Sequence, residues 1–135
     1  MLSLTLFQWR NVEVAHTAWN ILQTVHEGTK AIKINKLQQL TSKFESIRMS
    51  NDESFDEFYA KLNDIANSAY NLGEIYYQPK IVRKILRSLT ENFRPKVTVI
   101  TESKDVDSIL VDELVGSLQS YELDRKSTRL NSRHI

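Results

Sequence analysis

The stretch SFDEFYAKLNDIANSAYNLG, residues 54–73, carries a complete set of signals for one amphipathic helix. Ser54 is a good N-cap, and Glu57, three residues later, is placed to return a hydrogen bond to the backbone, as in a capping box. Gly73 can adopt the left-handed conformation that ends a helix at low cost. The apolar side chains share one arc of the helix: Phe55, Phe58, Tyr59, Leu62, Ile65, Ala66, Ala69 and Leu72. A helix with such a face needs partners, so this stretch predicts a small helical bundle.

Helical periodicity continues on both sides of this stretch. The predicted helices cover residues 15–28, 29–49, 54–73, 79–90, 96–101 and 109–124. Gly28 is expected to separate the first two, and Pro79 fits the first position of its helix, where a missing N–H costs nothing. We therefore expect an all-α fold, a small bundle of about five helices. Its predicted core consists of Trp19, Leu22, Leu37, Phe44, Phe58, Leu62, Ile65, Ile85, Leu86, Leu114 and Leu118.

The two ends of the chain lack this periodicity. Residues 1–14 alternate apolar and polar positions without a second strand to pair with, and we expect helix or coil there. Beyond Asp124 apolar residues nearly vanish, and small polar and basic residues take over. This composition predicts a disordered tail over residues 125–135.

Length and composition narrow the class of protein. A chain of 135 residues fits one domain with a single core. Because it contains no cysteine, disulfides, cysteine-based metal sites and a thiol nucleophile are excluded. No apolar run approaches the length of about 18 residues that a membrane span needs, and residues 1–9 lack the basic start of a signal peptide. We expect an intracellular, cytoplasmic protein with no membrane partner.

The formal net charge of +1 is unevenly distributed. Residues 125–135 hold four of the 18 basic residues, which leaves 14 basic against 17 acidic residues elsewhere. Any nucleic-acid binding must therefore come from a local face. The helix predicted at residues 79–90 offers one, formed by Lys80, Arg83, Lys84 and Arg87. This face could follow a phosphate backbone or contact a protein partner, or it could be a solvated surface paired with neighbours such as Glu74 and Glu91.

No residue pattern indicates catalysis. His16, His26 and His134 are too far apart in the sequence for a helical metal-binding pair. With three glycines in the chain, the close backbone approaches of a phosphate-binding loop are hardly available. We therefore expect no enzyme activity, no metal or other cofactor and no small-molecule substrate.

Several short sequence blocks occur in the same order, and at similar spacings, as in one known protein family. The blocks are Ala18-Trp19 with Leu22, Lys36-Leu37-Gln38-Gln39-Leu40, Phe55 with Phe58-Tyr59, Leu72-Gly73, Ile85-Leu86-Arg87-Ser88-Leu89, and Asp112-Glu113-Leu114-Val115-Gly116-Ser117-Leu118 with Tyr121-Glu122. Together they resemble the Gag polypeptide of copia-type LTR retrotransposons over residues 15–123. The resemblance implies a capsid-like helical structural protein that self-associates into virus-like particles and encloses the RNA of its transposable element.

The resemblance also implies how the chain is divided. Residues 15–124 would form the Gag-like domain, whose partners are other copies of itself and RNA. Residues 1–14 stand in place of the family's upstream helices, and residues 125–135 look like a non-native tail, so we expect a fragment of a Gag polypeptide. Family members usually continue into a Cys/His zinc knuckle, which this cysteine-free chain lacks. The alternative function is a nucleic-acid-binding helical module that acts through the basic face of residues 79–90.

Overall fold

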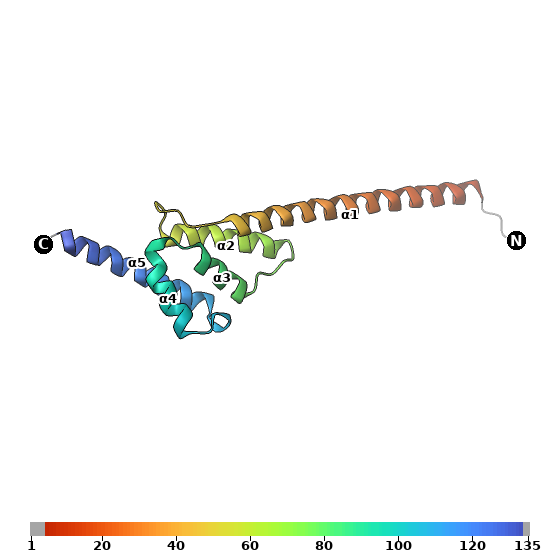
Figure 1. The fold of residues 1–135 in the computed structure, drawn as a ribbon. Coiled ribbons are helices and arrows are strands. Elements are labelled where there is room, and N and C mark those ends of the chain that lie inside the picture. The colour runs from red at the N-terminus through yellow and green to blue at the C-terminus, as the bar shows by residue number, and fades with distance from the viewer. Residues whose placement is uncertain (1–4, 134–135) are drawn as a thin grey trace. The chain divides into compact units, whose positions relative to one another are not determined.

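The computed structural model describes residues 5–133, and helices form all of the regular secondary structure in that range (Figure 1). The α-helices are α1 (Leu6–Ser46), α2 (Phe55–Asn71), α3 (Gln78–Ser88), α4 (Arg94–Ser103) and α5 (Val111–Arg133), and the single-turn 3-10 helices are η1 (Glu91–Phe93) and η2 (Val106–Ser108). The predicted all-α fold is confirmed. The chain divides into two compact units, residues 1–39 and residues 40–135, which are described in turn.

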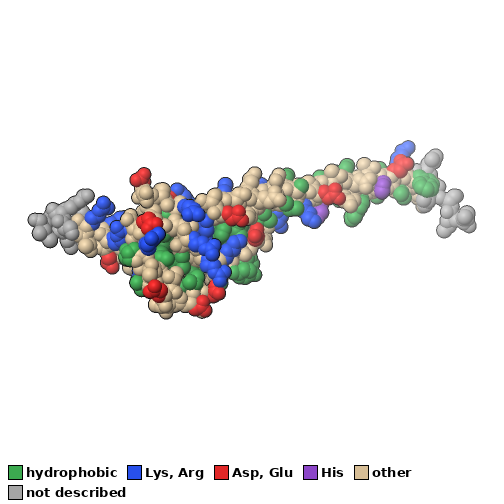
Figure 2. Space-filling model, in the orientation of Figure 1, with side chains coloured by type: hydrophobic (Ala, Val, Ile, Leu, Met, Phe, Trp, Pro, Cys, Tyr) green, Lys and Arg blue, Asp and Glu red, His purple; other side chains and the backbone are tan. Residues whose placement is uncertain are grey.

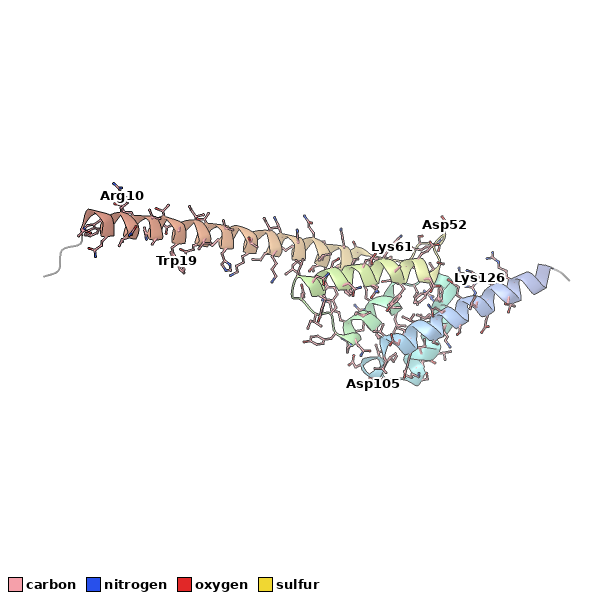
Figure 3. All side chains as sticks on the ribbon, turned by 180° about the vertical axis from the view of Figure 1, so that it is seen from behind. Arg10, Trp19, Asp52, Lys61, Asp105 and Lys126 are labelled. Atoms are coloured by element: carbon pink, nitrogen blue, oxygen red, sulfur yellow. The ribbon has the colours of Figure 1, made fainter. Side chains whose placement is uncertain are left out.

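The first unit contains, in its described residues, the part of α1 that ends at Gln39. Nine large apolar side chains of this part are exposed: Trp9, Val12, Val14, Trp19, Ile21, Leu22, Val25, Ile32 and Ile34. Trp19 and Leu22 were predicted to be core residues, but 65% and 64% of their surfaces are exposed, because no second element of this unit packs against them (Figure 3). Leu37 is partly exposed. No helix among residues 5–133 is both long and apolar enough to cross a membrane.

The helix α1 also runs through Gly28, where the sequence predicted a helix end. A glycine ends a helix by adopting a positive φ, and among the glycines of the described range only Gly73 does so. One glycine in a helix interior costs about 1 kcal/mol relative to alanine, which is too little to break a helix without a proline nearby. The helix begins at Leu6, nine residues before the predicted start, and residues 1–4 lie outside the described range.

The second unit, residues 40–135, encloses a hydrophobic core. Its buried apolar residues are Phe44, Met49, Phe55, Phe58, Leu62, Ala69, Tyr76, Val82, Ile85, Phe93, Ile100, Ile109, Leu114 and Leu118. The predicted core residues Ile65 and Leu86 are partly buried and pack against this set. Every helix of the unit therefore contributes to one core, and Phe93 joins two of them through rings 6.3 Å from Phe55 and 5.6 Å from Tyr121.

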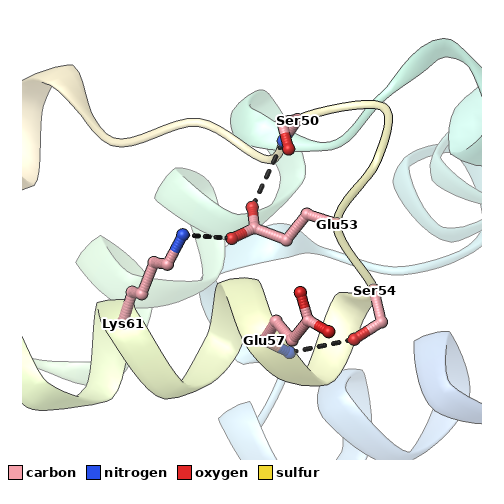
Figure 4. Close-up of polar contacts among 5 residues, drawn as sticks. All are labelled: Ser50, Glu53, Ser54, Glu57 and Lys61. Atoms are coloured by element: carbon pink, nitrogen blue, oxygen red, sulfur yellow. Dashed lines mark hydrogen bonds and ion pairs between the residues drawn. The ribbon is translucent and has the colours of Figure 1, made fainter.

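The N-terminus of α2 is fixed by side chains of the loop before it (Figure 4). The Ser54 hydroxyl accepts a hydrogen bond from the Glu57 N–H at 3.2 Å, as an N-cap should. Within the loop, the Glu53 carboxylate accepts a hydrogen bond from the Ser50 N–H at 3.2 Å. The same carboxylate forms an ion pair with Lys61 of α2. The hydrogen bond from Lys61 lowers the pKa of Glu53 against the opposing effect of burial.

The C-terminus of α2 has the predicted glycine cap. Gly73 has a φ of 91° and donates its N–H to the Tyr70 carbonyl at 2.9 Å. The N–H of Glu74 reaches the Ala69 carbonyl, also at 2.9 Å. These two bonds form a Schellman motif, which satisfies carbonyls that a helix end leaves without partners.

The helix α5 continues to Arg133, so the prediction of a disordered tail is wrong for residues 125–133. No glycine or proline follows Gly116, and an Arg125 guanidinium N–H donates to the Asn92 carbonyl at 3.0 Å. Further back in α5, the Glu122 carboxylate accepts from the Phe55 N–H at 2.9 Å and so satisfies a free donor at the start of α2. Residues 134–135 lie outside the described range.

Candidate functional site

The helix α3 places the four predicted cations on its outer side. Pro79 lies in its first turn, and Val82 and Ile85 are fully buried, which fixes the face that points into the core. The four cations occupy the remaining surface of the helix: Lys80, Arg83, Lys84 and Arg87. Figure 2 shows Lys and Arg side chains gathered over this part of the molecule.

These cations line an open cleft of about 580 Å³ together with Phe44, Glu45 and Arg48. Phe44 and Glu45 belong to the last turns of α1, and Arg48 lies in the loop that follows. We call Arg48, Lys80, Arg83, Lys84 and Arg87 the basic cleft. Arg48 was not predicted as part of this surface, because only the fold brings that loop beside α3 and no local pattern around residue 48 indicates it.

Two aromatic rings support the first lysine of the basic cleft. The Lys80 ammonium lies 4.2 Å from the centre of the Tyr76 ring and 5.1 Å from that of Phe44. The two rings are themselves 4.7 Å apart, and burial raises the pKa of the Tyr76 hydroxyl. Cation–π attraction holds the ammonium without neutralising its charge, so Lys80 remains available to an anion.

Arg83 has an acidic partner, but not one that the sequence analysis considered. It forms an ion pair with Asp107 of η2, whereas Glu91 pairs with Arg94 at 2.9 Å. The side chains of Arg83 and Asp107 are 50% and 56% exposed. An ion pair so exposed to water contributes at most about 1 kcal/mol to stability. An anionic ligand could therefore replace Asp107 as the partner of Arg83.

Lys84 is the most enclosed cation of the cleft and donates to the Glu45 carbonyl at 2.8 Å. Burial lowers the pKa of its ammonium, and the nearby charges of Arg48 and Arg87 lower it further. The opposing charge of Glu45 does not reverse this direction. The cleft therefore concentrates positive charge, an arrangement that favours binding of a multivalent anion.

The described residues offer no arrangement for metal binding. Within residues 5–133, no three His, Cys, Asp or Glu side chains converge closely enough to hold a metal ion. His16 and His26 are both exposed on α1, and His134 lies outside the described range. The chemistry that the structure supports at the basic cleft is the binding of an anion.

A comparison with models of protein families shows which family the chain belongs to. The family model described as gag-polypeptide of LTR copia-type matches residues 3–131. The chain belongs to this family. A Gag-like structural role follows from that membership. The match includes residues 3–14 and 125–131, which the sequence analysis set apart from the Gag-like domain. No curated protein and no solved structure matches this copia-type Gag chain.

Proposed function

We propose that this copia-type Gag chain self-associates into virus-like particles that enclose the RNA of its element. The observation that carries the proposal is the family match, which extends over residues 3–131 of the 135. Two surfaces of the structure suit the two parts of this function. The apolar side chains of α1 suit contact between copies, and the basic cleft suits RNA.

The exposed apolar residues of α1 support the self-association part. Nine large apolar side chains between Trp9 and Ile34 are each between 47% and 65% exposed. At 100° per residue, five of them share one side of α1: Val14, Ile21, Leu22, Val25 and Ile32. Exposed apolar patches on a protein surface usually mark an interaction site. Contact with further copies would remove this surface from water and stabilise the assembly by the hydrophobic effect.

Particle formation can be tested on the full chain. Purified protein is incubated over a range of concentrations with and without RNA, and the products are viewed by negative-stain electron microscopy and treated with nuclease. We expect closed particles that protect RNA from digestion. Protein that forms no particles at any concentration and leaves the RNA fully digestible would contradict the proposal.

A nucleic-acid-binding role of the basic cleft is a second candidate, favoured by the concentration of positive charge around Lys84. A cation that contacts phosphate releases counterions, so the logarithm of the affinity falls with the logarithm of the salt concentration. For single-stranded RNA, each phosphate contact contributes about 0.7 to that slope. Arg48 and Arg87 are suitable positions for the test, since the folded core does not contain either side chain.

We expect Arg48→Glu with Arg87→Glu to weaken RNA binding and to reduce the salt slope by at least about 1.4, the value for two lost contacts. The matched control is Lys96→Glu with Lys104→Glu, which changes the net charge equally outside the cleft. Fluorescence anisotropy at several salt concentrations measures both quantities. Equal losses in the two double variants would show that total charge, rather than the cleft, binds RNA.

A further inference from the structure

We propose that residues 14–32 of α1 pair in antiparallel orientation with the same residues of a second copy, which makes this segment a site of self-association. The inference rests on the proposed function and adds to it a surface, a partner and an orientation. It starts from a stripe of side chains spaced alternately by four and three residues: Val14, Ala18, Ile21, Val25, Gly28 and Ile32. We call this set the α1 seam.

The α1 seam has the spacing of a coiled-coil interface. Steps of four and three residues keep side chains on one side of a helix, as at the a and d positions of a heptad repeat. Its four branched side chains, at positions 14, 21, 25 and 32, are between 58% and 64% exposed. A Cβ atom added at Gly28 would meet nothing within 4 Å. The first unit therefore supplies no partner for the seam among its described residues.

The residues that flank the seam favour a second copy as the partner. All of them are uncharged: Ala15, Thr17, Leu22, Thr24, Thr29 and Ala31. An acidic or basic partner, RNA included, would find no complementary charge along this stripe. Two identical seams can meet without bringing like charges together or burying an unpaired charge. The chemistry of the seam is thus complementary to itself.

The sizes of the seam residues are symmetric about Gln23. In an antiparallel pair centred there, Val14 would lie opposite Ile32, and Ile21 opposite Val25. The two small residues, Ala18 and Gly28, would then also lie opposite each other. Large residues meet large ones and small residues meet small ones, so the separation of the helices would be small at two symmetric places. Such a two-fold interface closes on itself and gives a dimer.

Charge decides between the two possible orientations, since a parallel pair would also match each residue with its own copy. Lys30, Lys33 and Lys36 follow one another along α1 with no acidic residue between them. A parallel pair would bring together two copies of residues 27–36, where Glu27 and three lysines give a net charge of +2. The antiparallel pair places this segment beside residues 10–19 of the second copy, where the charges of Arg10 and Glu13 cancel. Like charges held close together oppose association, so the antiparallel orientation is favoured.

The orientation can be tested with two single variants of the full chain. Ile21→Glu and Val25→Lys each place one charge in the seam, and each variant alone is expected to raise the dimer dissociation constant at least tenfold. In an antiparallel pair positions 21 and 25 face each other, so an equal mixture of the two variants should associate again through the introduced carboxylate and ammonium. The matched controls, Asn20→Glu and Gln23→Lys, carry the same charges on another side of α1 and should leave the constant unchanged.

Sedimentation velocity measures these constants, and circular dichroism checks that every variant keeps its helices. Variants that weaken association singly but do not recover as a mixture would overturn the antiparallel orientation. If both variants associate as the unmodified chain does, the α1 seam is not the interface, although the proposed function stands. A chain that is monomeric without any substitution would overturn the inference together with the proposed self-association, and the seam would then serve a different partner.

Discussion

Leu62 lies at the centre of the buried face of α2, with 1% of its surface exposed. An aspartate there would bury a carboxylate without a partner, at a cost of several kcal/mol. The total stability of a domain is only about 5–15 kcal/mol. We expect Leu62→Asp to abolish the cooperative thermal unfolding of residues 40–135, followed by circular dichroism. The exposed neighbour offers the control Asn63→Asp, which should unfold cooperatively, and similar unfolding of Leu62→Asp would mean that this face of α2 is not needed by the core.

Single residues also show what the sequence could and could not predict. Leu62 and Trp19 both lie on apolar helical stripes, yet the first is buried and the second is 65% exposed. Periodicity identifies the apolar side of a helix but not the element that covers it. In the second unit several helices cover the stripe of α2, whereas the described part of the first unit holds a single helix. The burial of Leu62 was therefore predictable, and the exposure of Trp19 was not.

At the scale of elements, two glycines give opposite predictions. Gly28 lies inside α1 with open space around it, so Gly28→Ala should stabilise the helix by about 0.5–1 kcal/mol and slow amide exchange nearby about two- to fivefold. Gly73 caps α2 with a φ of 91°, where a Cβ atom costs about 1–2 kcal/mol, so Gly73→Ala should lower the stability of α2. Hydrogen exchange measures both effects. Faster exchange around residue 28 in Gly28→Ala would mean that α1 ends at this glycine, as its sequence had suggested.

The boundaries of α2 and α5 were not equally predictable. Both ends of α2 have local capping contacts, those of Ser54 with Glu57 and of Gly73 with Tyr70, which can be inferred from sequence, although the Phe55 N–H also donates to the distant Glu122. The last turns of α5 depend on a long-range contact as well, since Arg125 donates to the carbonyl of Asn92. No local pattern predicts that contact. The change in composition after Asp124 was therefore visible in the sequence, but the continuation of α5 beyond it was not.

At the scale of the whole molecule, the basic cleft combines predicted and unpredicted parts. The cations of α3 follow from one amphipathic helix and were predicted together. Arg48 and Asp107 join them from the loop after α1 and from η2, elements that only the folded chain brings beside α3. The electrostatic character of the cleft depends on both, because Arg48 adds to the positive charge around Lys84 and Asp107 pairs with Arg83.

Self-association is the central claim, and it belongs to the molecule as a whole. Static light scattering of the full chain over a wide range of protein concentrations tests it most directly, because it reports the mean mass without a label or a partner. The account predicts a mass that starts near the 15.7 kDa of one chain and rises steadily as the concentration increases. A mass that remains at 15.7 kDa up to the highest soluble concentration would contradict it.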